Sequence, residues 1–135
     1  MEQLTINSEF TEIEKVRSFL NENLVNLNLS EEDYFAIELS LLEICTNIVR
    51  YAYPEKNDKI FLKIWRDKDK FFLEVRDNGV PFDPTEVKKP DIDKILESEQ
   101  VGGFGILISR QFMDGFQYKR EHNQNILIMF KKLSA

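Results

Sequence analysis

Residues 43–52 read Glu-Ile-Cys-Thr-Asn-Ile-Val-Arg-Tyr-Ala, in the middle of a long helical pattern. Glu43 and Asn47 stand one helical turn apart and Arg50 follows after almost another turn, so a helix places all three side chains on one face. The simpler interpretation of such a row is the solvated face of an amphipathic helix. Asn disfavours helix interiors, however, and the rest of the stretch is mainly apolar, which favours a polar site that binds a metal ion and phosphates.

The helix around this stretch has recognisable ends. Ser30 is a typical N-cap residue, and three acidic residues follow it, as expected at the positive end of a helix dipole. The helix is expected to continue to about Tyr53 and to end before Pro54. Upstream, apolar residues at helical spacing predict another helix from Glu9 to about Leu27, and a short strand is predicted at residues 4–6.

Downstream of this helix the apolar residues alternate, which is typical of strands with one solvated face. The elements predicted there are strands over 59–66 and 71–77, a loop over 79–102 with a possible helical turn at 92–96, a helix over 103–113, and a hairpin of strands 116–120 and 126–131 that turns at 122–124. The order of elements predicts an α+β fold, a two-layer α/β sandwich in which helices cover one face of a mostly antiparallel sheet. Residues 1–135 are expected to form a single domain, because no composition shift divides them.

The composition limits the possible partners and the compartment. The chain has 135 residues, with 18 basic and 24 acidic side chains and a formal net charge of −6, so its surface disfavours nucleic acid and membrane lipids as partners. No apolar run is long enough for a bilayer-spanning helix, and the N-terminus lacks the features of a signal peptide. The single cysteine, Cys45, lies among apolar residues, which favours buried packing in a reducing, cytoplasmic compartment.

Two further clusters carry glycines. Residues 77–83 read Asp-Asn-Gly-Val-Pro-Phe-Asp at a predicted strand end, which alone is an ordinary turn signal. The functional interpretation is that Asp77 accepts a hydrogen bond from a ligand and that Gly79 lets the backbone approach that ligand. Residues 101–106 read Val-Gly-Gly-Phe-Gly-Ile before a predicted helix, where exposed N–H groups can bind an anion. The alternative there is a plain flexible turn, and the stretch is neither a P-loop nor a dinucleotide fingerprint.

Taken together and in this order, the three clusters resemble the N, G1 and G2 boxes of the GHKL ATPases. This superfamily, which has the Bergerat ATP-binding fold, groups gyrase-type topoisomerases, ninety-kilodalton heat-shock chaperones, histidine kinases and mismatch-repair ATPases. The resemblance covers nearly the whole chain and is strongest to the stand-alone anti-sigma factor serine/threonine kinases of the RsbW type. It includes the run from Gly102 to Asp114 and the closing hairpin, although Gln124-Asn125 stands where related ATPases often carry Gly-Thr.

The resemblance implies roles for individual residues. Glu43 is the expected general base or orienting group for the attacking hydroxyl, and Asn47 is the expected ligand of the Mg²⁺ that accompanies ATP. Asp77 is expected to bind the adenine amino group. The other residues implied in nucleotide binding are Arg50, Tyr51, Gly79, Phe82, Gly103, Phe104, Gly105 and Ile106, with the segment 80–102 as the ATP lid.

The resulting hypothesis is an ATP-dependent protein-serine kinase that acts as an anti-sigma factor. By the resemblance, it sequesters a sigma factor, phosphorylates a serine of a STAS-type antagonist, and forms a homodimer through its N-terminal strand and first helix. Two alternatives stay open: a non-catalytic ATP-binding module that holds its partner, and a simple ATPase that uses water as the acceptor. The lone His122 is expected in a solvent-exposed turn, and the length of the chain disfavours a topoisomerase or a chaperone.

Overall fold

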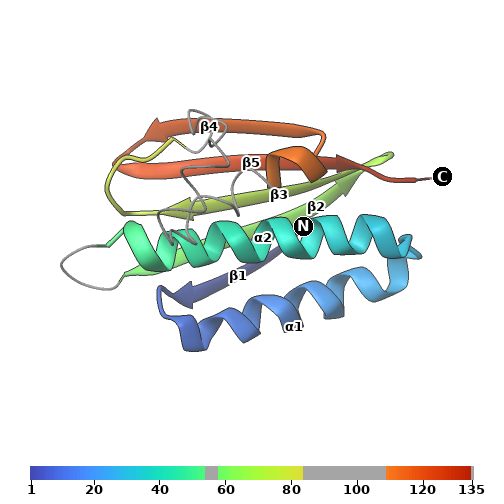
Figure 1. Ribbon diagram of the computed structural model, residues 1–135, viewed down its shortest axis with the longest axis horizontal. Coiled ribbons are helices and arrows are strands. Elements are labelled where there is room, and N and C mark those ends of the chain that lie inside the picture. Colours follow the sequence, from blue (N-terminus) through green and yellow to red (C-terminus); the bar gives the residue numbers. More distant parts are fainter. Residues whose placement is uncertain (54–57, 84–108, 135) are drawn as a thin grey trace, which may run out of the picture.

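The computed structural model describes residues 1–53, 58–83 and 109–134. They form two layers, a five-stranded sheet and a pair of helices, α1 (Ile13–Leu24) and α2 (Glu31–Tyr51), that cover one face of the sheet (Figure 1). This is the α+β sandwich that the order of elements predicts, so the predicted fold class is confirmed.

The start of α2 agrees with its sequence signals. The Oγ of Ser30 accepts a hydrogen bond from the backbone N–H of Asp33 at 3.1 Å, as expected of an N-cap residue. Acidic residues occupy the first turn and Arg50 lies in the last, a distribution that suits the helix dipole. The helix ends at Tyr51, slightly before the predicted end at Tyr53.

The first helix is shorter than the predicted range from Glu9 to Leu27. One 3-10 turn precedes it, Phe10–Glu12, and another follows it, Val25–Leu27, so regular α-helical bonding is limited to α1. Asn28, with a φ of 51°, then takes the left-handed conformation that ends many helices. The apolar spacing predicts the buried side of this segment, but it does not distinguish 3-10 turns from α-helix.

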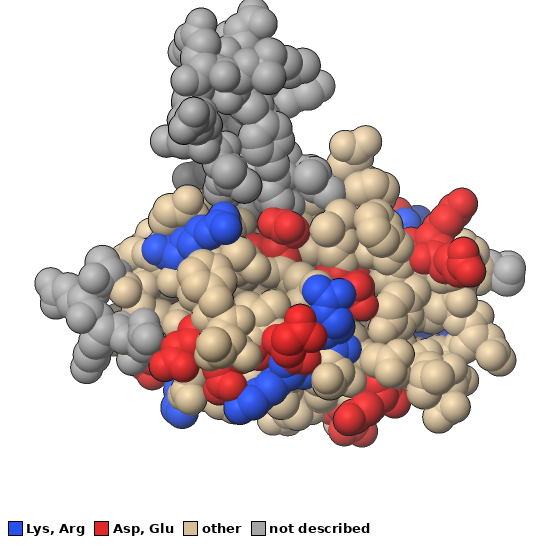
Figure 2. Space-filling model, turned by 60° about the horizontal axis from the view of Figure 1, so that its bottom comes forward, with Lys and Arg blue, Asp and Glu red and all other residues tan. Residues whose placement is uncertain are grey.

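The outer face of the helix layer carries ion pairs. Arg17 of α1 lies between Glu14 of the same helix and Glu38 of α2, with N–O distances of 3.5 and 3.2 Å. On the side shown in Figure 2, acidic and basic side chains are mixed with uncharged ones. Exposed ion pairs of this kind contribute at most about 1 kcal/mol each. Among the described residues, no helix combines the length and the apolarity that crossing a bilayer requires.

The sheet brings distant parts of the chain together. Its strands are β1 (Glu2–Asn7), β2 (Lys59–Asp67), β3 (Lys70–Asp77), β4 (Gly115–Glu121) and β5 (Gln124–Lys132), in the order β1-β2-β3-β5-β4. All neighbouring strands are antiparallel. The last residue of the central strand β3, Asp77, pairs with Asn125 of β5, although the two lie 48 positions apart in the chain.

The β4–β5 hairpin has a tighter turn than the one predicted at residues 122–124. His122 and Asn123 alone form the turn, with φ of 53° and 63°, and Gln124 already pairs with Glu121. Positive φ at both central positions is the geometry of a two-residue hairpin turn. The predicted solvent exposure of His122 is confirmed.

The hydrophobic core lies between the helix layer and the inner face of the sheet. Its most buried members are Leu20, Leu24, Ile37, Leu41, Ile60, Leu62, Leu73 and Met129. Cys45 is also fully buried, and burial raises the pKa of its thiol to about 12, so it is the unreactive packing residue that the sequence predicts. The helix predicted over 103–113 can be compared only in part, because residues 109–112 are helical and the remainder before them lies outside the described residues.

Candidate active site

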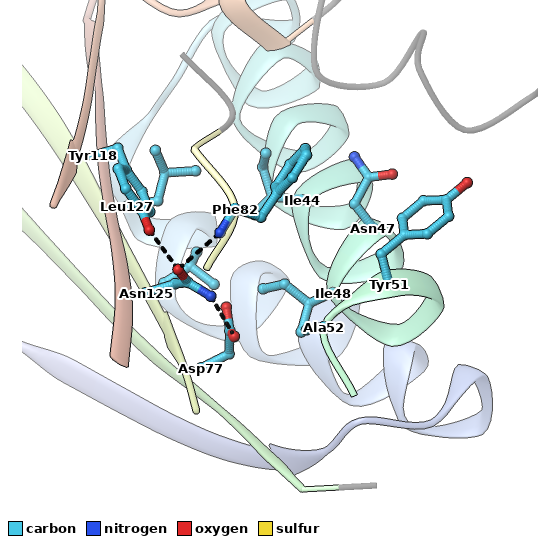
Figure 3. Close-up of a pocket in the computed structure, with 11 residues that line it drawn as sticks. Ile44, Asn47, Ile48, Tyr51, Ala52, Asp77, Phe82, Tyr118, Asn125 and Leu127 are labelled. Carbon is cyan, nitrogen blue, oxygen red and sulfur yellow. Dashed lines mark hydrogen bonds between the residues drawn. The ribbon is translucent and has the colours of Figure 1, made fainter. Parts of the chain in front are cut away.

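A pocket lies between the C-terminal half of α2 and the part of the sheet where β3 and β5 pair (Figure 3). Most of its wall is apolar and a few polar side chains converge on it, a composition typical of small-molecule sites. The lining residues are Ile44, Asn47, Ile48, Tyr51, Ala52, Val75, Asp77, Phe82, Tyr118, Asn125 and Leu127. Four residues predicted from the sequence thus meet here, namely Asn47, Tyr51, Asp77 and Phe82.

Asp77 ends β3 and is only 4% exposed. Its Oδ1 accepts hydrogen bonds from Nδ2 of Asn125 at 3.0 Å and from the backbone N–H of Gly79 at 2.8 Å. Burial raises the pKa of the Asp77 carboxyl above its ordinary value of 3.8, while the two hydrogen bonds and the charge of Arg120 act in the opposite direction. Both bonds end on Oδ1, so Oδ2 has no hydrogen-bond partner among the described residues and can accept a bond from a ligand.

Asn125 holds this end of the pocket together and is itself 6% exposed. Its Nδ2 also donates to the carbonyl oxygen of Val80 at 2.8 Å. Its Oδ1 accepts hydrogen bonds from the backbone N–H of Phe82 at 3.3 Å and from the hydroxyl of Tyr118 at 2.5 Å. One side chain therefore connects β3, β4 and β5 with the residues that follow β3 (Figure 3).

The backbone after β3 is held against the end of α2. The N–H of Val80 donates to the carbonyl oxygen of Ala52 at 2.9 Å, and Nη1 of Arg120 donates to the carbonyl oxygen of Gly79 at 2.8 Å. A Cβ at Gly79 would lie 2.4 Å from the Ala52 oxygen, far inside van der Waals contact. Among the described residues, the close neighbour that requires a glycine at position 79 is Ala52, and the approach of Gly79 to a ligand stays a prediction.

Tyr53, directly after α2, fixes the outer side of this connection. Its hydroxyl accepts a hydrogen bond from the backbone N–H of Asn78 and donates one to the carbonyl oxygen of Lys59, both at 2.7 Å. Burial, with the nearby charges of Asp77 and Asp58, raises the pKa of Tyr53 to about 12 against the opposing effect of the Asn78 bond. The hydroxyl therefore stays protonated and remains a donor.

The α2 side of the pocket has a different character. Asn47 is 8% exposed, and its Nδ2 has no hydrogen-bond partner among the described residues. A buried polar group without a partner costs roughly 1–3 kcal/mol, so a ligand that bonds to this amide recovers that cost.

A divalent cation fits this side only in company with phosphate. The described ranges contain no group of three or more His, Cys, Asp or Glu side chains that could hold a metal ion. The amide oxygen of Asn47 is a suitable hard ligand, and Mg²⁺ in nucleotide sites commonly combines one or two protein ligands with substrate phosphates. The residues present therefore fit a magnesium ion that arrives with a nucleotide.

The three residues predicted to share one face of α2 do not all reach the pocket. Asn47 lines the pocket, whereas Glu43 and Arg50 do not. Glu43 is partly buried, and its side chain makes no hydrogen bond or ion pair with the described part of the chain. The guanidinium of Arg50 lies 5.7 Å from the centre of the Phe10 ring, over the turn that precedes α1. Tyr51 also lines the pocket but is 55% exposed, which places its ring at the rim.

Several predicted residues cannot be compared with the structure. Gly103, Phe104, Gly105 and Ile106 lie outside the described residues, as does the predicted lid beyond Asp83. Their roles stay predictions.

Sequence reasoning missed Asn125 and Tyr118 as members of the site. Asn125 was noted only as a departure from the Gly-Thr pair of related ATPases, and Tyr118 only as part of a hairpin. A signal was available, because the alternation of Leu127 and Met129 places Asn125 on the inward face of its strand. A polar residue in an inward position needs partners, and here it has four.

Comparison with known sequences identifies relatives over most of the chain. The profile of the histidine kinase-like ATPase domain matches residues 6–131. The serine/threonine-protein kinase BtrW of Bordetella bronchiseptica is 31% identical over 96 residues, which cover 70% of this chain and 68% of the relative. The serine-protein kinase RsbW of Bacillus cereus is 28% identical over 106 residues, which cover 76% of this chain and 66% of the relative.

Solved structures agree on the fold. The RsbU and RsbW domains of a Mycobacterium tuberculosis protein match with a TM-score of 0.66 and 14% identity, over 100% of this chain and 33% of that chain. A chain of the SiaB–SiaC complex from Pseudomonas aeruginosa matches with a TM-score of 0.61 and 14% identity, over 97% of this chain and 89% of that chain. The predicted resemblance is confirmed, and so is the predicted class of enzyme, a serine/threonine-protein kinase, at the level of the family.

Proposed function

Because this chain belongs to the histidine kinase-like ATPase domain family, we propose that it is an ATP-dependent protein-serine kinase that also sequesters a sigma factor. One observation carries the proposal. One apolar pocket combines a buried carboxylate, Asp77, with a buried amide, Asn47, and the described part of the chain leaves one oxygen of the carboxylate and the Nδ2 of the amide without a partner. The first group suits a purine base and the second suits the phosphate end of the same nucleotide.

In the proposed complex, Oδ2 of Asp77 accepts a hydrogen bond from the adenine amino group. The apolar side chains of Ile44, Ile48 and Leu127 line the same pocket and contact the base. Phe82 and Tyr51, both at the rim, cover its edge. A few well-placed polar groups then set the orientation, while burial of the base against apolar walls supplies affinity.

In the proposed reaction, the hydroxyl oxygen of a protein serine forms a bond to the γ-phosphorus. The bond from that phosphorus to the bridging oxygen breaks, ADP leaves, and Glu43 accepts the serine proton. Asn47 would hold Mg²⁺ through its amide oxygen, and the ion would supply charge neutralisation at the phosphates. Glu43 has no partner among the described residues, which leaves its carboxylate available for this task.

Arg50 and the segment Gly103–Ile106 are proposed to contact the phosphates. The exposed cation–π contact between Arg50 and Phe10 is worth only about 0.5–1 kcal/mol, so a phosphate can compete for the guanidinium. The glycines before the helix would offer backbone N–H groups at its positive end. The segment 80–102 would act as the lid over the bound nucleotide.

The proposed protein partners are a sigma factor and a STAS-type antagonist that carries the acceptor serine. Support comes from relatives named as serine-protein kinases and from a fold neighbour solved in complex with a second protein. The proposed compartment is the cytoplasm. A homodimer through β1 and α1 is also proposed, since β1 is an edge strand whose outer backbone groups can pair with a second copy.

The test is a phosphotransfer assay with Mg²⁺, γ-labelled ATP and a candidate serine-bearing antagonist protein. We expect label on a serine of the antagonist. Glu43→Ala is expected to reduce transfer by about 10²–10⁴-fold with little change in nucleotide affinity, because it removes a proton acceptor and no described contact.

Each other outcome points to a specific alternative. Labelled phosphate released to water without labelled protein would indicate a simple ATPase. Tight nucleotide binding without transfer or release would indicate a binding module. Full kinase activity in Glu43→Ala would show that another residue is the base.

A further inference from the structure

The side chain of Asn125 uses its complete hydrogen-bonding capacity within the pocket wall. An amide donates two hydrogen bonds and accepts two. Nδ2 of Asn125 donates to Asp77 and Val80, and Oδ1 accepts from Phe82 and Tyr118. Turned by 180°, the amide would place its oxygen against a carboxylate and a carbonyl oxygen, and its NH₂ against the N–H of Phe82. The network therefore fixes which end of the amide faces Asp77.

We infer that Asn125 is a specificity-determining positioning residue that makes Asp77 select purines with an amino group over purines with a keto group at the same ring position. It does so by occupying Oδ1 of Asp77 with a neutral N–H donor, which leaves the carboxylate as an acceptor only. The inference rests on the proposed function, because it presupposes that Asp77 meets the purine base. Adenine presents an N–H donor there, whereas hypoxanthine and guanine present an oxygen acceptor.

The surroundings of Asp77 explain why a neutral donor matters. Arg120 of β4 is the cation near the carboxylate, and its Nη1 is bonded to the Gly79 carbonyl oxygen. The two neighbouring hydroxyls belong to Tyr53, beyond α2, and to Tyr118 of β4, and both have a raised pKa and stay protonated. Asn125 is thus the side chain whose replacement by an acid changes the protonation of Asp77 most directly.

Two further acidic residues lie near the two tyrosines. The charge of Asp58 acts on Tyr53 and that of Asp83 on Tyr118. Asn125→Asp keeps the shape of the side chain but places a second carboxyl about 3 Å from Asp77, where two like charges cannot both ionise. The pair then shares a proton and becomes a partial donor, which a keto purine can accept.

The test compares the affinities of ADP and IDP, which differ at that ring position, by calorimetry between pH 6 and 9. We expect the wild type to bind ADP at least about 30-fold more tightly than IDP, since a site built for a donor rejects an analogue that lacks it. In Asn125→Asp we expect this ratio to fall at least about tenfold at pH 6 and to recover as the pH rises and the shared proton is lost. A purely structural defect would weaken both nucleotides alike at every pH.

Gln124→Glu is the matched control. It makes the same amide-to-acid change one residue earlier, on a side chain that donates to Asn78 and lies outside the pocket wall. We expect the ADP-to-IDP ratio of this variant to equal that of the wild type.

A second pair of variants tests the inference if Asn125→Asp does not fold. Asn125→Thr retains a hydroxyl donor for Asp77 and should keep the ratio within about threefold, whereas Asn125→Leu removes the side-chain donor at this position and should lower it about tenfold. Equal ratios in the two variants, or a wild-type ratio in Asn125→Asp at all pH values, would overturn the inference. A wild type that binds neither nucleotide would overturn the proposed function as well, so the two failures are distinguishable.

Discussion

The strand side and the helix side of the pocket treat their polar groups in opposite ways. On the strand side, Asp77 and Asn125 are buried and hydrogen-bonded to each other and to the neighbouring backbone. On the helix side, neither the buried Nδ2 of Asn47 nor the side chain of Glu43 has a hydrogen-bond or ion-pair partner within the described ranges. The difference indicates that hydrogen bonds within the protein fix the polar groups of the strand side before a ligand binds, whereas those of the helix side are left to bond with the ligand.

This division suits the two ends of a nucleotide. A base is recognised by the direction of a few hydrogen bonds, and fixing those groups in advance lowers the ordering cost of binding. A phosphate chain carries charge and brings its own cation, so its site can keep unsatisfied groups that the bound ion and phosphates then satisfy. The Nδ2 of Asn47, which has no partner in the described part of the chain, carries the energetic cost of keeping such a group ready for the ligand.

Two buried asparagines allow the largest test of this comparison. Asn125→Ala is expected to lower the free energy of unfolding by about 3 kcal/mol, because Asp77 loses one of its two hydrogen bonds and the Val80 carbonyl oxygen and the Phe82 N–H lose the bonds they make to Asn125. Asn47→Ala is expected to change it by less than about 1 kcal/mol, since no described bond to Nδ2 is lost and Ala is the better helix former. Chemical denaturation of both variants measures the difference.

Equal losses of stability in these two variants would contradict the division of the pocket. The cation-dependent part of ATP affinity should show the opposite order, with the larger loss in Asn47→Ala. The gain in ATP affinity on adding Mg²⁺ should disappear in Asn47→Ala and persist in Asn125→Ala.

The second prediction concerns Asp77, where ADP affinity and stability should respond to pH in opposite directions. Burial raises the folded-state pKa of this carboxyl above 3.8, so the folded protein binds the proton more tightly than the unfolded chain does. This group therefore adds stability as the pH falls through that pKa. Protonation removes the acceptor for the adenine amino group, so ADP affinity should fall over the same range.

Asp77→Asn should lower ADP affinity about 100-fold at neutral pH, because it replaces a carboxylate acceptor with a group that also donates. The variant should lose the acid-range dependence of ADP affinity as well. Calorimetric titrations of wild type and variant from neutral pH to just above the acid unfolding transition provide the measurement. If the two proteins show the same pH dependence, another group governs it.

Most of the fold could be predicted because its signals are local. Ser30 with the acids after it locates the start of α2, and alternating apolar residues locate the strands. Asn47 and Asp77 could be predicted for the same reason, since each lies in a short motif with characteristic spacing. Tyr51 and Phe82 followed from the resemblance.

The features that could not be predicted from the sequence depend on contacts between residues far apart in the chain, or on details that apolar spacing does not show. Asn125 reaches Asp77 only through the β3–β5 register across 48 positions. Arg50 shares a helix face with Asn47 in principle, yet its long side chain turns toward Phe10, which lies in another element. Helical spacing alone also does not show that the first helix is flanked by 3-10 turns, because 3-10 and α segments bury the same apolar residues.

The smallest predicted effect tests whether the strand side depends on its contact with α2. Gly79→Ala is expected to destabilise the fold by about 2 kcal/mol, because the new Cβ would lie 2.4 Å from the Ala52 carbonyl oxygen and the backbone must move. That movement displaces the N–H that bonds to Asp77, so ADP affinity should fall about fivefold in calorimetry.

Gly115→Ala is the control, since its Cβ would meet the ring of Phe130, which does not line the pocket. The control should lose stability and keep its ADP affinity. If both variants lost ADP affinity in proportion to their loss of stability, ADP affinity would depend only on the stability of the whole fold. The contact between the strand side and α2 would then have no separate effect on the pocket.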